Sequence, residues 1–177
     1  GKELDSLADM VSFGVLPSVI IYQLFALSPQ IDFGASWLSF SAFIIAVFSA
    51  LRLAKFNIDT RQSENFIGLP TPANALLIAS FPLIIGDSNT YFAGFIVNQW
   101  FLVLFSIIMS LLLVAEVPLI SLKFKSLKFK ENLLRYILII SSVLLLLFLK
   151  FEAVPIIIII YFLISLVQFR TADKNLS

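Results

Sequence analysis

Long apolar stretches dominate this chain, and a membrane-spanning helix needs about 20 predominantly apolar residues. Of its 177 residues, 60% are hydrophobic and only 13% are charged, whereas an ordinary soluble domain is roughly a quarter charged. Six windows approximately meet the length requirement: Ala8–Leu27, Ala35–Phe56, Thr71–Ile85, Phe95–Ile120, Leu133–Leu149 and Ala153–Phe169. The sequence therefore predicts an all-α, polytopic integral membrane protein with six transmembrane helices and no separate soluble domain.

Positive charge is concentrated in alternate connections between these windows. The connections at 28–34 and 86–94 contain no Lys or Arg. The cations lie instead around the other connections and in the tail, at Arg52, Lys55, Arg61, Lys123, Lys125, Lys128, Lys130, Arg135, Arg170 and Lys174. With six spans, all of these lie on the same side as both termini, and Lys150 is the exception. The positive-inside rule makes that side cytoplasmic.

The missing residue types restrict the possible chemistry. The chain has no Cys and no His, which excludes disulfides, thiolate metal sites and the usual neutral-pH general base. Its net charge of +1 gives no indication of nucleic-acid binding. Any reaction must therefore use carboxylates, hydroxyls, amides and cations, and oxygen ligands favour magnesium, manganese or calcium over zinc.

A pair of carboxylates stands at the beginning of the first window. On a helix, Gly1, Asp5 and Asp9 share one face, with the two carboxylates about 6 Å apart along the axis. Acidic residues are common at helix N-termini, where the dipole favours them, and Asp5 fits that explanation. Asp9 fits it less well because it lies two turns into the helix, before Met10. The spacing favours a site for a divalent metal and a phosphate group at the membrane surface.

A second polar region follows the second window. Arg52 and Lys55 would either anchor a helix end by extending to the interface, or hold a phosphate or carboxylate. The segment 57–74 would be a solvated loop, except that Thr71 and Asn74 enter the next helix, where polar groups need partners. Thr71 and Asn74, together with Arg61, are candidates to line a pocket for a small zwitterion.

The remaining polar and apolar runs have structural explanations. Glu116 precedes Pro118 near the end of the fourth window and is interpreted as structural. The basic run Lys123–Lys130 is interpreted as a topology determinant that contacts anionic lipid. The runs Leu144–Leu147 and Ile156–Ile160 are expected to face lipid.

Three strings resemble a known family. Gly1, Asp5 and Asp9 match G-x-x-x-D-x-x-x-D, the second half of the CDP-alcohol phosphatidyltransferase signature. The strings from Gly1 to Val15, Arg-Leu-Ala-Lys-Phe-Asn from Arg52, and Phe-Ile-Gly-Leu-Pro-Thr-Pro-Ala-Asn-Ala from Phe66 resemble its phosphatidylserine synthase branch. The specific similarity covers roughly Gly1 to Ala75, and beyond it only the hydropathy pattern agrees.

This resemblance implies transfer of a phosphatidyl group from CDP-diacylglycerol to the hydroxyl of L-serine, with release of CMP. It implies Mg²⁺ or Mn²⁺ bound by Asp5 and Asp9, with Asp9 also the general base. Gly1 would permit close approach of the nucleotide, and the substrate-binding candidates are Arg52, Lys55, Arg61, Thr71 and Asn74. It further implies a homodimer in the bacterial cytoplasmic membrane, with the active site and termini facing the cytoplasm.

The first half of the family signature, D-x-x-D-G-x-x-A-R, would lie before Gly1. Residues 1–177 are therefore expected to be a single membrane-embedded domain without its N-terminal helices, and to be inactive alone. Two alternatives are compatible with the sequence. One is a transferase of the same family that uses glycerol 3-phosphate or inositol. The other is a small-solute transporter, although transporters typically have pseudo-symmetric halves and a midplane site.

Overall fold

The structure is a computed structural model that describes residues 1–29, 37–58, 66–87, 91–120 and 132–174. Most of these residues are helical, and the described strands form one antiparallel pair of two residues each. The elements run in the order α1 (Lys2–Met10), η1 (Val11–Val15), α2 (Leu16–Ala26), η2 (Trp37–Phe43), α3 (Ile44–Ile58), β1 (Phe66–Ile67), α4 (Thr71–Gly86), α5 (Ala93–Ile96), α6 (Gln99–Val114), β2 (Pro118–Leu119), α7 (Leu133–Leu149), η5 (Lys150–Glu152) and α8 (Ala153–Lys174).

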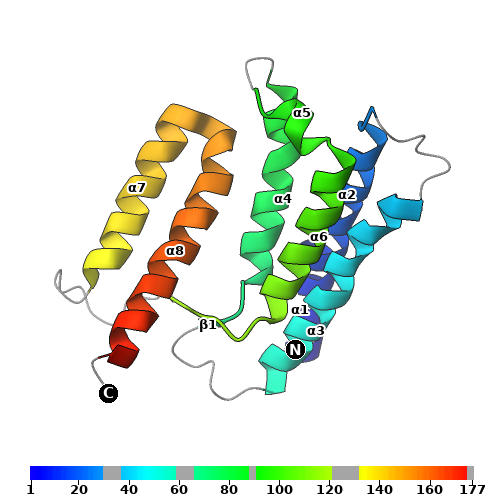
Figure 1. The fold of residues 1–177 in the computed structure, drawn as a ribbon. Coiled ribbons are helices and arrows are strands. Elements are labelled where there is room, and N and C mark those ends of the chain that lie inside the picture. Colours follow the sequence, from blue (N-terminus) through cyan, green and yellow to red (C-terminus); the bar gives the residue numbers. More distant parts are fainter. Residues whose placement is uncertain (30–36, 59–65, 88–90, 121–131, 175–177) are drawn as a thin grey trace.

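The apolar windows form helices, as predicted. Three continuous helical stretches are long and apolar enough to cross a membrane: Glu3–Ala26, Trp37–Ile58 and Leu133–Val167. The third contains a reversal, because Lys150 has a φ of +48° and α7 packs against α8 as a hairpin (Figure 1). The helices α4 and α6 are shorter, at 16 residues each. These features confirm an all-α, polytopic membrane protein.

The fourth predicted span is wrong in its boundaries. The window Phe95–Ile120 contains the helix α6 only from Gln99 to Val114. Asn98 begins this helix by accepting hydrogen bonds from the amides of Trp100 and Phe101, at 2.9 and 3.2 Å, which is the usual function of an N-cap. The helix ends where Ala115 turns extended, before Pro118. Hydropathy does not detect these stops because the flanking residues are also apolar.

The first long helix contains one wide turn, η1, directly after Asp9 and Met10. In this π-helical turn the Leu16 amide donates to the carbonyl of Val11, five residues back. Pro17 follows and has no amide hydrogen to continue the ladder. The Ser18 hydroxyl donates to the Gly14 carbonyl at 2.9 Å. A Cβ on Gly14 would lie 3.0 Å from the Ser49 Cβ, so glycine permits the close packing of η1 on α3.

A short segment before α4 is attached to the end of α6. The strands β1 and β2 pair antiparallel, with Phe66 opposite Leu119. The Gly68 amide donates to Val117 at 2.9 Å, and the Leu69 amide donates to Leu112 at 3.0 Å. Gly68 has a φ of +76°, and a Cβ there would lie 2.6 Å from the Leu113 carbonyl oxygen. Glycine is therefore required at this position for two independent reasons.

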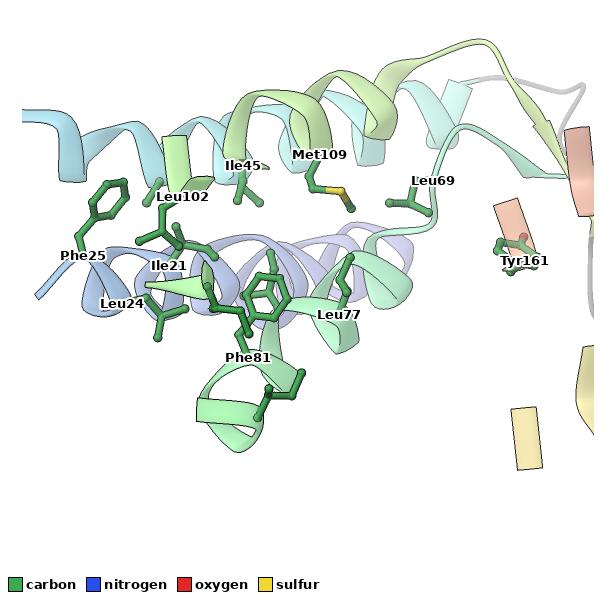
Figure 2. Packing of buried hydrophobic residues seen from close by; sticks show 14 of the residues in the cluster. Ile21, Leu24, Phe25, Ile45, Leu69, Leu77, Phe81, Leu102, Met109 and Tyr161 are labelled. Atoms are coloured by element: carbon green, nitrogen blue, oxygen red, sulfur yellow. The ribbon is translucent and has the colours of Figure 1, made fainter. Parts of the chain in front are cut away.

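The buried apolar cluster lies mainly among α2, α3, α4 and α6. Figure 2 shows Ile21, Phe25, Ile45 and Leu102 packed at one end of this cluster. All four side chains have no exposed surface. Pro82 lies inside α4, and interior prolines are tolerated in membrane helices, where neighbouring groups re-satisfy the backbone. These helices form the bundle that positions the polar end of the molecule.

The described chain segments that contain Lys2, Arg52, Lys55, Arg170 and Lys174 share one end of the molecule. The N-terminus, the end of α3, the strand pair and the end of α8 lie together at the lower end in Figure 1. The turn between α7 and α8, which contains Lys150, lies at the opposite end. The predicted alternation of charge can be compared with the structure only at these described segments. The basic run Lys123–Lys130 is outside the described residues.

Candidate active site

The carboxylate pair lies on α1, at the polar end of the first long helix. Helix α1 is formed as predicted, so Gly1, Asp5 and Asp9 follow one another along one face. The Asp5 amide donates to the Gly1 carbonyl at 3.0 Å. Asp5 is exposed and Asp9 is half-buried. The space around Gly1 is open, with no atom within 4 Å of a Cβ built there.

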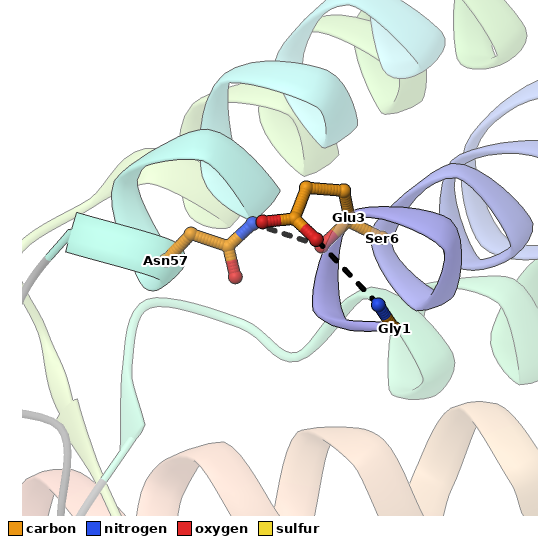
Figure 3. A network of polar contacts seen from close by, with 4 residues as sticks. All are labelled: Gly1, Glu3, Ser6 and Asn57. Carbon is orange, nitrogen blue, oxygen red and sulfur yellow. Dashed lines mark hydrogen bonds and ion pairs between the residues drawn. The ribbon is translucent and has the colours of Figure 1, made fainter.

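Helix α3 contacts α1 at Ser6, a residue that lies between Asp5 and Asp9 in the sequence. The Asn57 side-chain amide donates to the Ser6 hydroxyl at 2.8 Å (Figure 3). Ser6 follows Asp5 directly, so this bond fixes the first turn of α1 relative to the end of α3. Glu3 lies on the same helix, in its first turn. It is highly exposed, which makes it a useful control for the two aspartates.

Arg52 lies on α3 and is almost completely buried, with 7% of its surface exposed. Its Nε has no hydrogen-bond partner among the residues that the structure describes. The guanidinium interacts electrostatically with the Asp9 carboxylate and with the Tyr161 hydroxyl group, and it lies 5.8 Å from the centre of the Phe56 ring. A buried cation with an unused donor beside a carboxylate is a suitable ligand for an anionic substrate group.

Asn74, in the second turn of α4, carries an unpartnered amide. It has no exposed surface, and neither Nδ2 nor Oδ1 has a partner in the described part of the chain. Thr71, one turn earlier, is also buried. An unsatisfied buried amide costs about 1–3 kcal/mol, so a purely structural position would normally hold an apolar residue. Donor and acceptor in one side chain match the carboxylate and ammonium groups of an amino acid.

The turn η1 contacts both α3, which carries Arg52, and α4, which carries Thr71 and Asn74. Since η1 continues α1 beyond Asp9, both of the elements that carry these candidates contact the helix on which Asp9 lies. The predicted candidates from three separate segments are thus arranged around the junction of α1 and η1.

Lys55 and Arg61 are the two remaining substrate-binding candidates. The Lys55 ammonium forms an ion pair with Glu116 at 3.0 Å, and both side chains are partly exposed. This contact joins α3 to the segment between α6 and β2. Arg61 lies outside the described residues.

The chemical type of the donors fits a hard divalent ion. Asp5 and Asp9 offer only oxygen atoms, which magnesium and manganese prefer. The number of donors is smaller than such an ion needs, because the described residues contain no group of three or more His, Cys, Asp or Glu placed to hold a metal. Among the described residues, the two aspartates alone are therefore too few to hold such an ion.

Two residues that the sequence did not single out connect α8 to the site. The Tyr161 hydroxyl donates to the Ile120 carbonyl at 2.9 Å, and the Ile120 amide donates to the Ser165 hydroxyl at 3.2 Å. Both side chains are buried. Helix α8 therefore binds both the amide and the carbonyl of Ile120, the residue that follows β2. The sequence did contain a signal for this contact. Tyr161 and Ser165 are polar residues four positions apart in an apolar helix, so they lie on the same face.

The family model for CDP-alcohol phosphatidyltransferases matches residues 1–118. The chain belongs to this family. The match includes every candidate site residue from Gly1 to Asn74, and it ends before α7 and α8.

Several curated proteins are similar to this family member. A CDP-diacylglycerol--serine O-phosphatidyltransferase of Helicobacter pylori strain 26695 is 32% identical over 170 residues, covering 95% of this chain and 67% of that protein. The protein of the same description from strain J99 is 41% identical over 106 residues, covering 55% of this chain and 43% of its own length. An archaetidylserine synthase of Methanothermobacter thermautotrophicus is 41% identical over 83 residues, covering 47% and 33%.

Proposed function

We propose that this chain is part of an enzyme that transfers a phosphatidyl group from CDP-diacylglycerol to L-serine. The observation that carries the proposal is the Asp5–Asp9 face of α1, placed at the polar end of a membrane-length helix beside Arg52. A lipid-linked pyrophosphate lies at that level of a bilayer. The family membership supports the reaction type and favours it over transport. Serine as acceptor is supported by the names of the relatives.

Each step of the reaction can be assigned to atoms. The serine hydroxyl oxygen attacks the phosphorus that carries the diacylglycerol, a new P–O bond forms, and the P–O bond to CMP breaks. Asp9 takes the proton of the serine hydroxyl, because its half-buried carboxylate lies on the accessible face of α1. The Arg52 guanidinium offers Nε to a phosphate oxygen. CMP leaves with the electrons of the broken bond.

Asp5 and Asp9 would hold a divalent ion together with ligands outside the described residues. The ion, Mg²⁺ or Mn²⁺, would neutralise the pyrophosphate and stabilise the charge that develops on CMP. The family signature would place the other ligands before Gly1, so residues 1–177 alone are expected to be inactive. The single-domain organisation of 1–177, without the helices that contain those ligands, remains a prediction.

The acceptor would lie between α1 and α4. Asn74 can donate from Nδ2 to the serine carboxylate and accept from its ammonium at Oδ1, with the Thr71 hydroxyl one turn away. Arg61 and Lys55 would contribute to binding of the carboxylate or phosphates. A buried amide without protein partners favours a ligand that supplies both kinds of hydrogen-bonding group.

The location and assembly follow from the same proposal. The end of the molecule with Asp5, Asp9 and the cationic segments would face the cytoplasm, in the bacterial cytoplasmic membrane. We expect a homodimer from the family resemblance.

CMP release from CDP-diacylglycerol by the full-length protein tests the proposal. Release would be measured with and without Mg²⁺ or Mn²⁺, and with serine, glycerol 3-phosphate or inositol as acceptor. The proposal predicts release that needs both metal and serine. Release with another acceptor would keep the metal site and overturn the assignment of Thr71 and Asn74 to serine. No release with any acceptor would overturn the transferase.

A further inference from the structure

The hydroxyl of Tyr161 is fixed in position by contacts between α8 and Ile120. It donates to the Ile120 carbonyl at 2.9 Å, across 41 positions of the sequence. One turn further along α8, the Ser165 hydroxyl accepts from the Ile120 amide at 3.2 Å and donates to the Tyr161 carbonyl at 2.8 Å. Tyr161 is 8% exposed and Ser165 has no exposed surface. Both hydroxyls are therefore held by partners in a buried environment.

The segment that contains Ile120 is also attached to the end of α3. The Lys55 ammonium pairs with Glu116 at 3.0 Å, and Glu116 precedes Ile120 by four positions. Lys55 follows Arg52 by three positions, which is about one turn of α3. In Figure 2, Tyr161 lies at the same end of the buried cluster as Leu69 and away from Phe25. The segment 116–120 therefore connects α8 to the part of α3 that carries Arg52.

The Tyr161 hydroxyl group and the Arg52 guanidinium interact electrostatically. Because the hydroxyl hydrogen is used by the Ile120 carbonyl, the phenol oxygen offers only lone pairs to other neighbours, whereas a guanidinium offers only donors. The Asp9 carboxylate attracts the same guanidinium from the first long helix. Two elements at opposite ends of the sequence thus act on Arg52, and its Nε still has no partner among the described residues.

We propose that Tyr161 is a positioning residue, which orients the Arg52 guanidinium so that Nε is available to a phosphate of the CDP-linked lipid donor. This inference rests on the proposed function. A group that binds a reacting phosphate must be held in a defined geometry by the residues around it, and a second attraction restricts the guanidinium more than Asp9 does alone. Tyr161 lies outside residues 1–118, which the family model matches. Helix α8 thus contributes to a site whose other residues belong to the matched region.

A matched pair of variants tests the role of Tyr161. Tyr161→Phe and Ser165→Ala each remove one hydrogen bond between α8 and Ile120, but only Tyr161→Phe removes the oxygen that acts on Arg52. The Kd of CDP-diacylglycerol would be measured by calorimetry with the full-length protein in detergent, and its KM by serine-dependent CMP release. Tyr161→Phe should raise both constants roughly 3- to 10-fold, and Ser165→Ala should leave them unchanged. Equal effects of the two variants would overturn the proposal.

The KM for serine separates positioning of Arg52 from a general disturbance of the fold. Ile120 follows β2, which pairs with β1, and β1 is followed by α4 with Thr71 and Asn74. A loosened strand pair would therefore affect the proposed serine site and would raise the KM for serine in both variants. Positioning predicts a KM for serine that is unchanged in Tyr161→Phe, with a raised KM for the lipid donor. A parallel rise of both KM values would make Tyr161 a structural residue.

A double-mutant cycle tests whether Tyr161 acts through Arg52. In an Arg52→Gln background, Tyr161→Phe should not raise the Kd of CDP-diacylglycerol further, because the group that Tyr161 orients is absent. Additive effects of the two changes would show independent roles and overturn the proposal.

The same measurements separate this inference from the proposed function. If the unmodified full-length protein neither binds CDP-diacylglycerol nor releases CMP, the proposed function fails and the role of Tyr161 fails with it. Donor binding and serine-dependent release that are both unchanged in Tyr161→Phe would refute the positioning role alone and leave the transferase intact.

Discussion

The bundle of α1 to α6 and the hairpin of α7 and α8 use similar apolar helices in different ways. The bundle buries its side chains against one another, and contacts such as Gly14 on Ser49 bring helices close together. Along α7, all of which the structure describes, only Leu138 is buried. In a bilayer, helices gain from close packing rather than from avoiding lipid. The bundle is therefore packed more closely than α7 among the described residues.

Truncation of one isoleucine in each region should show the largest contrast. Ile45→Ala in α3 removes a fully buried side chain and should cost about 2–5 kcal/mol of unfolding free energy. Ile140→Ala in α7 removes an exposed side chain and should change it by less than about 0.5 kcal/mol. Chemical unfolding in detergent would measure both. Equal losses would show that the hairpin is packed as tightly as the bundle.

Gly68→Ala tests how the segment before α4 is attached to the end of α6. An alanine there would adopt a left-handed backbone conformation at a cost of about 1–2 kcal/mol. Its Cβ would also meet the Leu113 carbonyl, and overpacking typically costs about 1–3 kcal/mol. Gly94→Ala is the control, since a Cβ there meets nothing within 4 Å. A thermal unfolding midpoint that falls only for Gly68→Ala is the expected result. Equal midpoints would contradict the packing described for this segment.

Asn74→Leu separates function from stability within the bundle. The variant removes hydrogen bonds to a charged ligand, each worth about 1.5–3 kcal/mol, so the KM for serine should rise at least about tenfold. The unfolding midpoint should stay or increase, because an unsatisfied buried amide is removed. Steady-state kinetics and thermal unfolding would be compared. An unchanged KM with a lower midpoint would make Asn74 a structural residue.

The smallest effect is expected at the Lys55–Glu116 ion pair. Exposed pairs contribute up to about 1 kcal/mol, so Lys55→Met and Glu116→Gln should each have little effect on stability. If Lys55 also binds a substrate phosphate, only Lys55→Met will raise the KM for the lipid donor. Equal kinetic effects of the two variants would contradict a separate role of Lys55.

The sequence predicted the elements where hydropathy and helix breakers agree. The helices Thr71–Gly86, Leu133–Leu149 and Ala153–Lys174 begin at the predicted residues because Pro70, the basic run and the 150–152 turn separate them clearly. The α1 face was predictable because an i, i+4 spacing is local. The end of α6 was not, since the residues beyond Val114 are also apolar.

Contacts between distant residues could not be predicted from one sequence. Asn57 bonds Ser6 from 51 positions away, and Lys55 pairs with Glu116 from 61 positions away. The isoleucine run 156–160 was expected to face lipid. Ile156 and Ile159 are exposed, but Ile158 and Ile160 pack against the core. An aliphatic run has no pattern that distinguishes these two faces, so the inward face of α8 became visible only in the fold.

The most direct test of the account compares Asp9→Asn with Glu3→Gln in the full-length protein. Both changes neutralise one carboxylate on α1, but only Asp9 lies on the face assigned to the metal and the reacting hydroxyl. Serine-dependent CMP release would be measured with saturating Mg²⁺, and thermal unfolding would check the fold. The account predicts a fall of at least about 10²–10⁴-fold for Asp9→Asn and a rate near that of the unmodified protein for Glu3→Gln. Comparable rates in the two variants would contradict it.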